Sequence, residues 1–307
     1  MATNQDSPSA IKAIDTIMGG MQGTTSGYLI ATSDAALVET GPASSSQAVI
    51  DALRTHSIGP RDLRHIVVTH VHLDHAGGAG TLSAAFPLAT VWVHERGAPH
   101  LVDPAKLVAS TERSYGPEEA GRLFGVTDPV PSERIRAVTG GETIPLGDHA
   151  LEVLATPGHA SHHVALVERT TGALFTGDAV GVHLPGMDDV RPMAPPPEFD
   201  LDAALKSIEL IRERAQGTLL FSHFGAADAA DELCEDAVQG LLRWAHSRPP
   251  SLDNEPSPEA TEATLRQLEA RRDDRLSSEY RSRLELLWVY KLAGAGLSRY
   301  WRTHPQA

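Results

Sequence analysis

Residues 69–78 read Thr69-His70-Val71-His72-Leu73-Asp74-His75-Ala76-Gly77-Gly78, and they follow directly on the apolar run Ile66-Val67-Val68. Imidazole and carboxylate are the side chains that bind zinc or iron at neutral pH. Extended backbone at the end of a strand points His70 and His72 to the same side. Asp74 and His75 are adjacent, so they must diverge and can serve a second ion. The stretch therefore predicts a metal site at the end of a strand.

The composition limits the class of protein and the class of partner. The chain has 307 residues, 41% of them hydrophobic, which is enough for a full globular core. Its formal net charge of −14 repels phosphate backbones, so we expect no nucleic-acid partner despite the metal motif. A small-molecule substrate fits better.

Targeting and redox signals are sparse. Cys234 is the only cysteine, which excludes a disulfide framework and a cysteine-based zinc cage. The polar N-terminus lacks the basic start and apolar core of a secretory signal. No run approaches the roughly 18 apolar residues of a transmembrane helix. We therefore expect no membrane partner and a cytoplasmic location.

Hydrophobic periodicity predicts a mixed architecture. Short strands are expected at 11–18, 28–30, 36–38, 66–68, 90–93, 151–155, 163–168, 173–175 and 218–221, and helices at 44–56, 200–215 and 227–246. Residues 95–136 predict a helical insertion with helices at 104–115 and 117–123 and no strand. The expected divisions are a catalytic domain over 1–246, a Pro-rich linker over 247–258 and a helical extension over 259–307.

The extension carries an apolar stripe at three- and four-residue steps, from Leu265 to Leu292. Such a stripe must be buried. We expect it to dock on the body of the same chain, with pairing of two copies in a homodimer as the alternative.

Three further stretches place a metal-capable residue just after an apolar strand and beside Gly or Pro. They are Thr156-Pro157-Gly158-His159, Phe175-Thr176-Gly177-Asp178 and Phe221-Ser222-His223-Phe224-Gly225. Rigid strand ends can hold a ligand within the tolerance that a metal demands. Each stretch is weak alone, but their joint occurrence supports one composite site.

This set resembles the metallo-β-lactamase superfamily over roughly residues 11–246, because the motif order His-x-His-x-Asp-His, His, Asp, His is matched in full. The resemblance implies an α+β fold, a four-layer αββα sandwich with two metal ions at the loop edges of its sheets. It assigns His70, His72 and His159 to one ion, assigns Asp74, His75 and His223 to the other, and makes Asp178 the bridge between them.

A bridging Asp after Thr-Gly is similar to the glyoxalase II, lactonase and thioesterase branches, whereas β-lactamases proper generally lack it. Glu39-Thr40-Gly41 stands where the superfamily usually has Asp-Thr-Gly, an Asp that supports the metal loop through hydrogen bonds. The resemblance thus favours a hydrolase in which Glu39 takes over that support.

Two divalent cations, zinc first and iron or manganese as alternatives, would hold a hydroxide that attacks a thioester, lactone or ester carbonyl. Asp74 and Asp178 are the catalytic carboxylates beside this metal-bound hydroxide. Residues expected to reach the substrate from the loops are His162, His183, Arg191 and Tyr28.

Three other functions remain open. An acyl-homoserine lactone lactonase would use the same ions with a different pocket. A mononuclear iron oxidoreductase resembling the persulfide dioxygenases would keep only one metal. A metal-binding module without catalysis would hold ions and turn over nothing.

Overall fold

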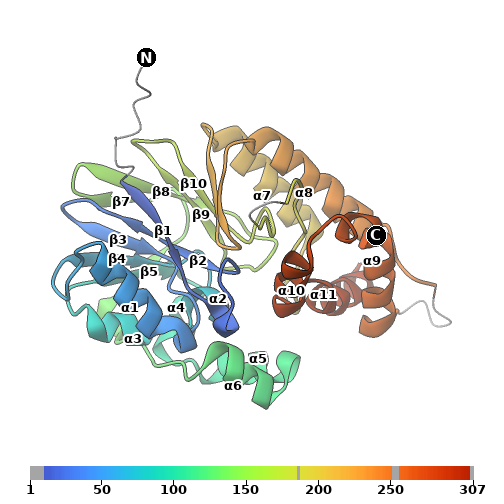
Figure 1. Ribbon diagram of the computed structural model, residues 1–307, viewed down its shortest axis with the longest axis horizontal. Helices are drawn as coiled ribbons and strands as arrows, with labels where there is room; N and C mark the ends of the chain where they lie inside the picture. Colours follow the sequence, from blue (N-terminus) through green and yellow to red (C-terminus); the bar gives the residue numbers. More distant parts are fainter. Residues whose placement is uncertain (1–9, 185–186, 251–255, 305–307) are drawn as a thin grey trace.

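The computed structural model describes residues 10–184, 187–250 and 256–304, and its strands form two six-stranded sheets (Figure 1). The first sheet has the order β1-β2-β3-β4-β5-β6, with β1 (Ile11–Asp15), β2 (Ser26–Ile30), β3 (Ala35–Val38), β4 (Leu63–Val67), β5 (Thr90–His94) and β6 (Ile135–Val138). The second has the order β12-β11-β10-β9-β8-β7, with β7 (Thr143–Leu146), β8 (His149–Ala155), β9 (Val164–Glu168), β10 (Leu174–Gly177), β11 (Leu219–Phe221) and β12 (Gly225–Ala227).

Alternation along the strands of the first sheet separates two layers of core. Leu29, Leu37 and Ile66 pack together with side chains of the helices on one face. Their neighbours Ile30 and Val38 pack on the other face against side chains of the second sheet. Successive side chains of a strand point to opposite faces, so both faces of this sheet are buried.

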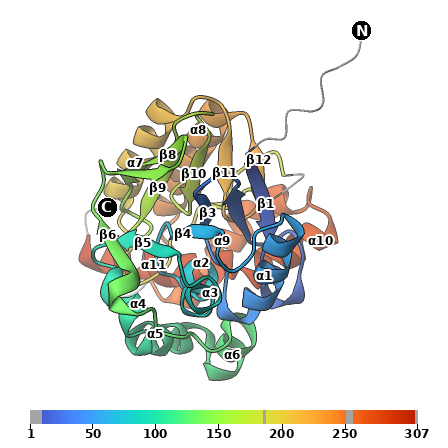
Figure 2. The same ribbon diagram turned by 90° about the vertical axis from the view of Figure 1, so that its left-hand side faces the viewer.

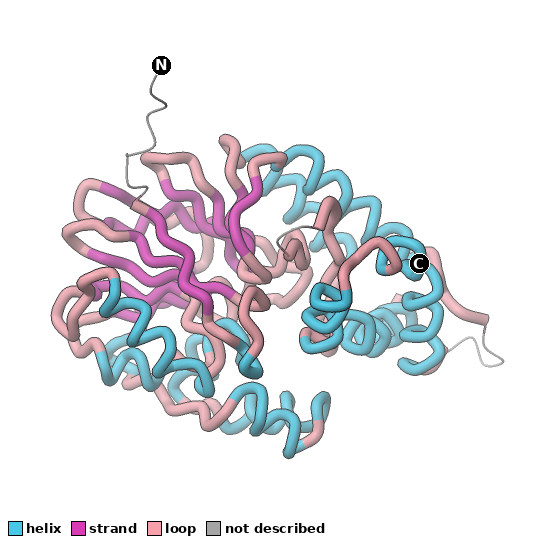
Figure 3. The backbone as a smooth tube through the Cα atoms, in the orientation of Figure 1, coloured by secondary structure: helices cyan, strands magenta, loops and turns pink. Residues whose placement is uncertain are grey.

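Helices cover the two outer faces. The first sheet carries α1 (Ser46–Thr55) and α3 (Ala79–Ala85), and the second carries α7 (Leu201–Arg214) and α8 (Ala230–Ala245). Figures 2 and 3 show the resulting order of helix, sheet, sheet and helix. The predicted four-layer αββα sandwich is confirmed.

Residues 95–136 are helical as predicted, with α4 (Ala98–Val102), α5 (Ala105–Tyr115) and α6 (Pro117–Phe124). The prediction that no strand occurs there is wrong at its end, because Ile135 begins β6. The sequence also failed to predict β7 and β12. All three missed strands are short edge strands that expose part of their length, and β7 contains Pro145, so the usual buried-strand signal is absent.

The extension forms α9 (Pro258–Asp273), α10 (Ser278–Leu286) and α11 (Val289–Thr303). Leu265, Leu297 and Trp301 share one core cluster with Trp244 of α8. The Trp301 indole also donates to the carbonyl oxygen of Ala245 over 3.1 Å. The predicted docking on the body of the same chain is confirmed, and the homodimer stays a prediction.

The division into domains also stays a prediction, and residues 251–255 of the expected linker lie outside the described residues. In the described part of the chain, no helix has the length and apolar character needed to cross a membrane.

Candidate metal centre and active-site cavity

The His-rich loop lies between β4 and α3 and contains one short helix, α2 (Leu73–Ala76). The carbonyl oxygen of His72 accepts hydrogen bonds from the backbone N–H groups of His75 and Ala76. The chain thus changes from extended to helical backbone at His72. This change separates His70 and His72 from Asp74 and His75, as the sequence predicts.

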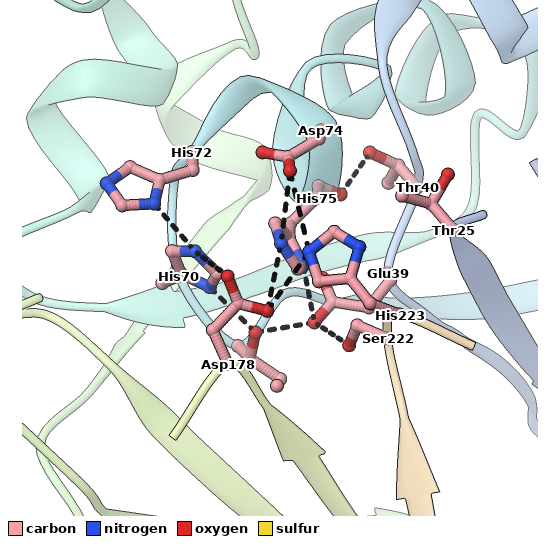
Figure 4. Close-up of polar contacts among 12 residues, drawn as sticks. Thr25, Glu39, Thr40, His70, His72, Asp74, His75, Asp178, Ser222 and His223 are labelled. Carbon is pink, nitrogen blue, oxygen red and sulfur yellow. Dashed lines mark hydrogen bonds and ion pairs between the residues drawn. The ribbon is translucent and has the colours of Figure 1, made fainter. Parts of the chain in front are cut away.

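The other three candidate ligands lie just beyond strands of the second sheet. His159 follows β8, Asp178 follows β10 and His223 follows β11. These strand ends meet the His-rich loop at one edge of the sandwich, so residues far apart in the chain converge. Figure 4 shows Asp178 and His223 beside the candidate ligands of the loop.

The first set of ligand atoms surrounds His72. Its Nδ1 atom lies 2.9 Å from Nε2 of His70 and 3.0 Å from Nε2 of His159. Nε2 of His159 also lies 3.3 Å from Oδ2 of Asp178. One ligand atom from each of these four residues falls within 4.8 Å of the others, which is the spacing of a cation site.

The second set consists of Asp74, His75 and His223. The Nε2 atoms of both histidines lie 3.6 Å from Oδ2 of Asp74. They lie 3.4 Å (His75) and 3.3 Å (His223) from Oδ1 of Asp178. The two carboxylate oxygens of Asp178 therefore face different sets.

Three buried atoms at the centre of the second set have no hydrogen-bond partner among the described residues. They are Nε2 of His75, Nε2 of His223 and Oδ1 of Asp178. Buried polar atoms without partners are rare because each loses its interaction with water. Imidazole nitrogens and carboxylate oxygens that converge in this way fit a divalent cation. The seven residues remain predicted ligands.

The charge distribution supports the same interpretation. Burial lowers the pKa values of His70 and His159 well below 6.5, which favours the neutral, metal-binding form. Burial also acts to lower the pKa of His75, but the carboxylates of Asp178, Asp74 and Glu39 raise it well above 6.5. The histidines of the first set are thus disposed to be neutral, whereas carboxylates surround His75 in the second set.

His163 holds Asp178 in place, a role that the sequence did not indicate. Its Nε2 atom accepts a hydrogen bond from the Asp178 backbone N–H over 3.0 Å, and its Nδ1 atom lies 2.8 Å from the Thr156 hydroxyl. Gly177 has a φ of 51°, and a Cβ atom there would come within 2.4 Å of the His163 ring. Glycine is required at this contact, which explains the glycine of the Thr-Gly-Asp sequence.

Glu39 supports the loop from the opposite side. Its Oε1 atom accepts hydrogen bonds from the hydroxyl groups of Thr69 and Ser222. The same oxygen lies 3.5 Å from Nδ1 of His75 (Figure 4). The side chain is buried and fixes the orientation of a candidate ligand.

A cavity of about 280 Å³ opens onto the candidate ligands His72, Asp74, His159 and Asp178. One wall comes from α5 and α6. Another part of the lining comes from Met193 and residues 195–198 and from Leu287 and Leu292 of the C-terminal extension. The extension thus helps to form the cavity beside the metal centre.

Of the four loop residues expected to reach substrate, the structure brings only His162 to this cavity. Arg191 is fully buried and pairs with Asp189 and Asp273. The Tyr28 hydroxyl donates to the carbonyl oxygen of Phe221 over 2.6 Å and thereby ties β2 to β11. His183 packs its ring on Phe221 at 5.2 Å and lies outside the residues that line the cavity.

His183 and Arg191 are apart from the cavity because the described parts of the loop over 182–191 fold back on the body, whereas Tyr28 is held on β2 by its contact with Phe221. The backbone N–H of His183 donates to the carbonyl oxygen of His223, and Val182 pairs with Arg191. Residues that do line the cavity, such as Tyr115 on α5, give no distinctive signal in the sequence.

The geometry agrees with comparison to known proteins. The sequence profile of the Metallo-beta-lactamase superfamily matches residues 20–223. This chain belongs to that superfamily. The match includes all seven candidate ligands, so the metallo-β-lactamase fold and its candidate metal residues coincide on one continuous stretch.

A relative within the superfamily is the metallo-beta-lactamase fold-containing protein ST1585 of Sulfurisphaera tokodaii, 29% identical over 184 residues, or 59% of this chain and 67% of the relative. Its crystal structure matches this fold with a TM-score of 0.65 at 23% identity, covering 86% of this chain and 96% of that chain.

Two relatives carry the names of enzymes. The acyl-coenzyme A thioesterase MBLAC2 of Gallus gallus is 35% identical over 129 residues, covering 40% of this chain and 43% of the relative. A hydroxyacylglutathione hydrolase of Bdellovibrio bacteriovorus is 29% identical over 150 residues, covering 49% and 45%. The match spans less than half the length of each enzyme.

Proposed function

We propose that this protein is a binuclear metal-dependent hydrolase that cleaves the thioester, lactone or ester carbonyl of a small molecule. The observation that carries the proposal is the position of Asp178, whose two carboxylate oxygens face two different sets of imidazole ligands. Thioesterase and hydroxyacylglutathione hydrolase relatives support the same reaction class.

Two cations in this centre would lower the pKa of a water molecule toward 7 and polarise the carbonyl group under attack. Zinc suits a set of five histidines and two carboxylates, and iron and manganese suit it as well. Within the protein, Asp178 holds the two sets at a fixed separation. Asp74 faces the cavity, so its carboxylate is well placed to hold a proton beside the substrate.

Two exposed basic residues at the cavity favour one class of substrate over another. Lys106 and Arg113 are exposed on α5 and line the cavity, and neither has an ion pair with any described residue. Two free cations on a chain with a net charge of −14 offer a site for an anion. A thioester or ester with an anionic leaving group suits this site better than a neutral lactone.

The experiment compares metal content and turnover in the wild type, His70→Ala, Asp178→Ala and the control His56→Ala, whose side chain is exposed. We expect about two metal ions per wild-type chain and hydrolysis of an acyl thioester. Turnover should fall by at least about 10³-fold in the two site variants, because the ions and their bound water supply the nucleophile. Unchanged turnover in either site variant would contradict the proposal.

The same protein samples separate the rival functions. An N-acyl homoserine lactone and a matched acyl thioester, assayed side by side, distinguish a lactonase from a thioesterase. One bound iron with oxygen consumption would identify an oxygenase. A fully loaded protein that turns over none of the esters, lactones or thioesters would identify a binding module.

A further inference from the structure

Tyr115 is the last residue of α5 and has a fixed ring orientation. Gly116 ends α5 with a φ of 82°, and Pro117 begins α6, so the chain bends sharply at this residue. The Tyr115 ring stacks on Trp288 at 4.4 Å and meets the edge of Phe124 at 5.1 Å. Contacts from both the insertion and the C-terminal extension therefore orient one phenol.

The phenol lies near the carboxylates of the candidate metal centre, because the charges of Asp74 and Asp178 act on its pKa. Tyr115 lines the same cavity as Asp74 and Asp178. Its hydroxyl makes no hydrogen bond with any described residue, although the ring is packed on two sides. Burial and then the charges of Asp74 and Asp178 raise its pKa well above 10, so the group is an O–H donor at neutral pH. A donor without a protein partner in a cavity beside two carboxylates is available to donate a hydrogen bond to a molecule bound in the cavity.

We propose that Tyr115 is a catalytic residue whose hydroxyl donates a hydrogen bond to the substrate carbonyl oxygen as that oxygen becomes negative. This assignment rests on the proposed function and adds a protein donor to it. A fixed donor aimed at developing charge lowers the barrier because it needs no reorganisation during the reaction.

Trp288 is a positioning residue for the same step. Trp288 directly precedes α11. Its ring contacts both the Tyr115 ring and the Lys291 ammonium group, which lies 3.5 Å from the centroid of the indole. Trp288 is not among the residues that line the cavity, so it acts through the phenol. The C-terminal extension, whose described residues supply no candidate metal ligand, thus acts on the reaction by orienting Tyr115.

The test uses full-length, metal-loaded protein and the variants Tyr115→Phe, Trp288→Leu and the double variant, with Tyr280→Phe as a matched control outside the cavity. Metal content should stay at the wild-type level in all four. We expect kcat on an acyl thioester to fall about 10- to 100-fold in Tyr115→Phe while KM changes less than about threefold. Trp288→Leu should lower kcat in the wild-type background and add no further loss in the double variant.

A second measurement does not depend on turnover. An alkyl phosphonate imitates the tetrahedral carbon and negatively charged oxygen that form when the carbonyl group is attacked. Tyr115→Phe should weaken phosphonate binding about tenfold relative to binding of the carboxylate product. The assignment is overturned by wild-type turnover and wild-type phosphonate affinity in Tyr115→Phe, or by an additive loss in the double variant. Absence of hydrolysis by the wild type would instead overturn the proposed function and leave the phosphonate comparison to decide on Tyr115.

Discussion

Glu39 shows how one residue outside the candidate ligands controls the centre. It adopts a φ of 64°, a left-handed conformation that is costly for a residue with a side chain. The carboxylate is buried and accepts from Thr69 and Ser222, so it connects the His-rich loop to the end of β11. Oε1 also lies beside Nδ1 of His75, so the Glu39 side chain fixes the orientation of this candidate metal ligand. These contacts offset the cost of the backbone conformation of Glu39.

Glu39→Gln removes the negative charge and keeps the volume. We expect metal affinity to fall about 10- to 100-fold, as for other groups that orient metal ligands. Competition with a chromogenic chelator measures the change. Glu168→Gln is the control, because Glu168 is an equally buried acid that bonds Thr171 and His149 away from the centre. Equal metal affinities in the wild type and Glu39→Gln would contradict the role.

At the scale of elements, α11 lies against a loop that lines the cavity, and the backbones of the two segments are in close contact. A Cβ atom at Gly296 would come within 1.9 Å of the carbonyl oxygen of Ala194, and one at Gly294 within 2.7 Å of the Pro258 carbonyl oxygen. Glycine at both positions lets α11 lie directly on α9 and on the loop before Pro195. Since Pro195, Pro196 and Pro197 line the cavity, this packing sets its width.

Gly296→Ala should therefore lower the free energy of unfolding by about 1–3 kcal/mol, because the loop must move to admit the methyl group. KM should rise as the wall shifts. Urea denaturation and steady-state kinetics measure the two effects. The control Gly121→Ala places its methyl group in open space at an exposed position of α6, where better helix propensity should raise stability by up to about 1 kcal/mol. Wild-type stability in Gly296→Ala would refute the contact.

Across the whole molecule, a partly buried charge network joins the extension to the body. Arg191 pairs with Asp189 at 2.5 Å and with Asp273 of α9 at 2.9 Å. Arg272 of α9 pairs with Asp189 at 2.7 Å and with Asp236 of α8 at 2.8 Å. Arg191 is fully buried, so loss of one partner leaves a poorly compensated charge.

The network makes docking depend on pH. Although burial acts to raise the pKa of Asp189, its hydrogen bond to Arg191 and the charges of Arg191 and Arg272 lower it below 3.8. The folded state thus takes up this proton at a lower pH than the unfolded state. The stabilisation is complete above the unfolded pKa of about 3.9 and is lost as the pH falls through the folded pKa.

Asp189→Asn should reduce stability by about 2 kcal/mol at pH 7. The difference from the wild type should narrow as the pH falls below about 4. Urea denaturation at a series of pH values measures it, with the exposed neighbour Asp188→Asn as the control. A difference that stays constant from pH 7 to pH 3 would show that the carboxylate of Asp189 contributes nothing through its charge.

Local sequence signals predicted most of the sandwich and all seven candidate ligands. Strands with buried faces and helices with apolar stripes produce periodic patterns, and His70, His72, Asp74 and His75 lie within six positions. His159, Asp178 and His223 each follow an apolar strand, so a local pattern marks them too. The edge strands β6, β7 and β12 were not predicted, because strand residues that face solvent need no apolar pattern.

The sequence by itself determined most of the strands and helices and the chemistry of the candidate centre, because periodicity and ligand type are properties of neighbouring residues. The four-layer arrangement was implied by the resemblance of the motif order to the superfamily. Only the tertiary structure decided which residues line the cavity beside the candidate centre and which support it. It buried Arg191 and Tyr28 in structural contacts, made His163 the support of Asp178, and brought Tyr115 and Trp288 together across 173 positions of the chain. Such contacts depend on how the loops and the extension pack on the sandwich, and no local pattern encodes that packing.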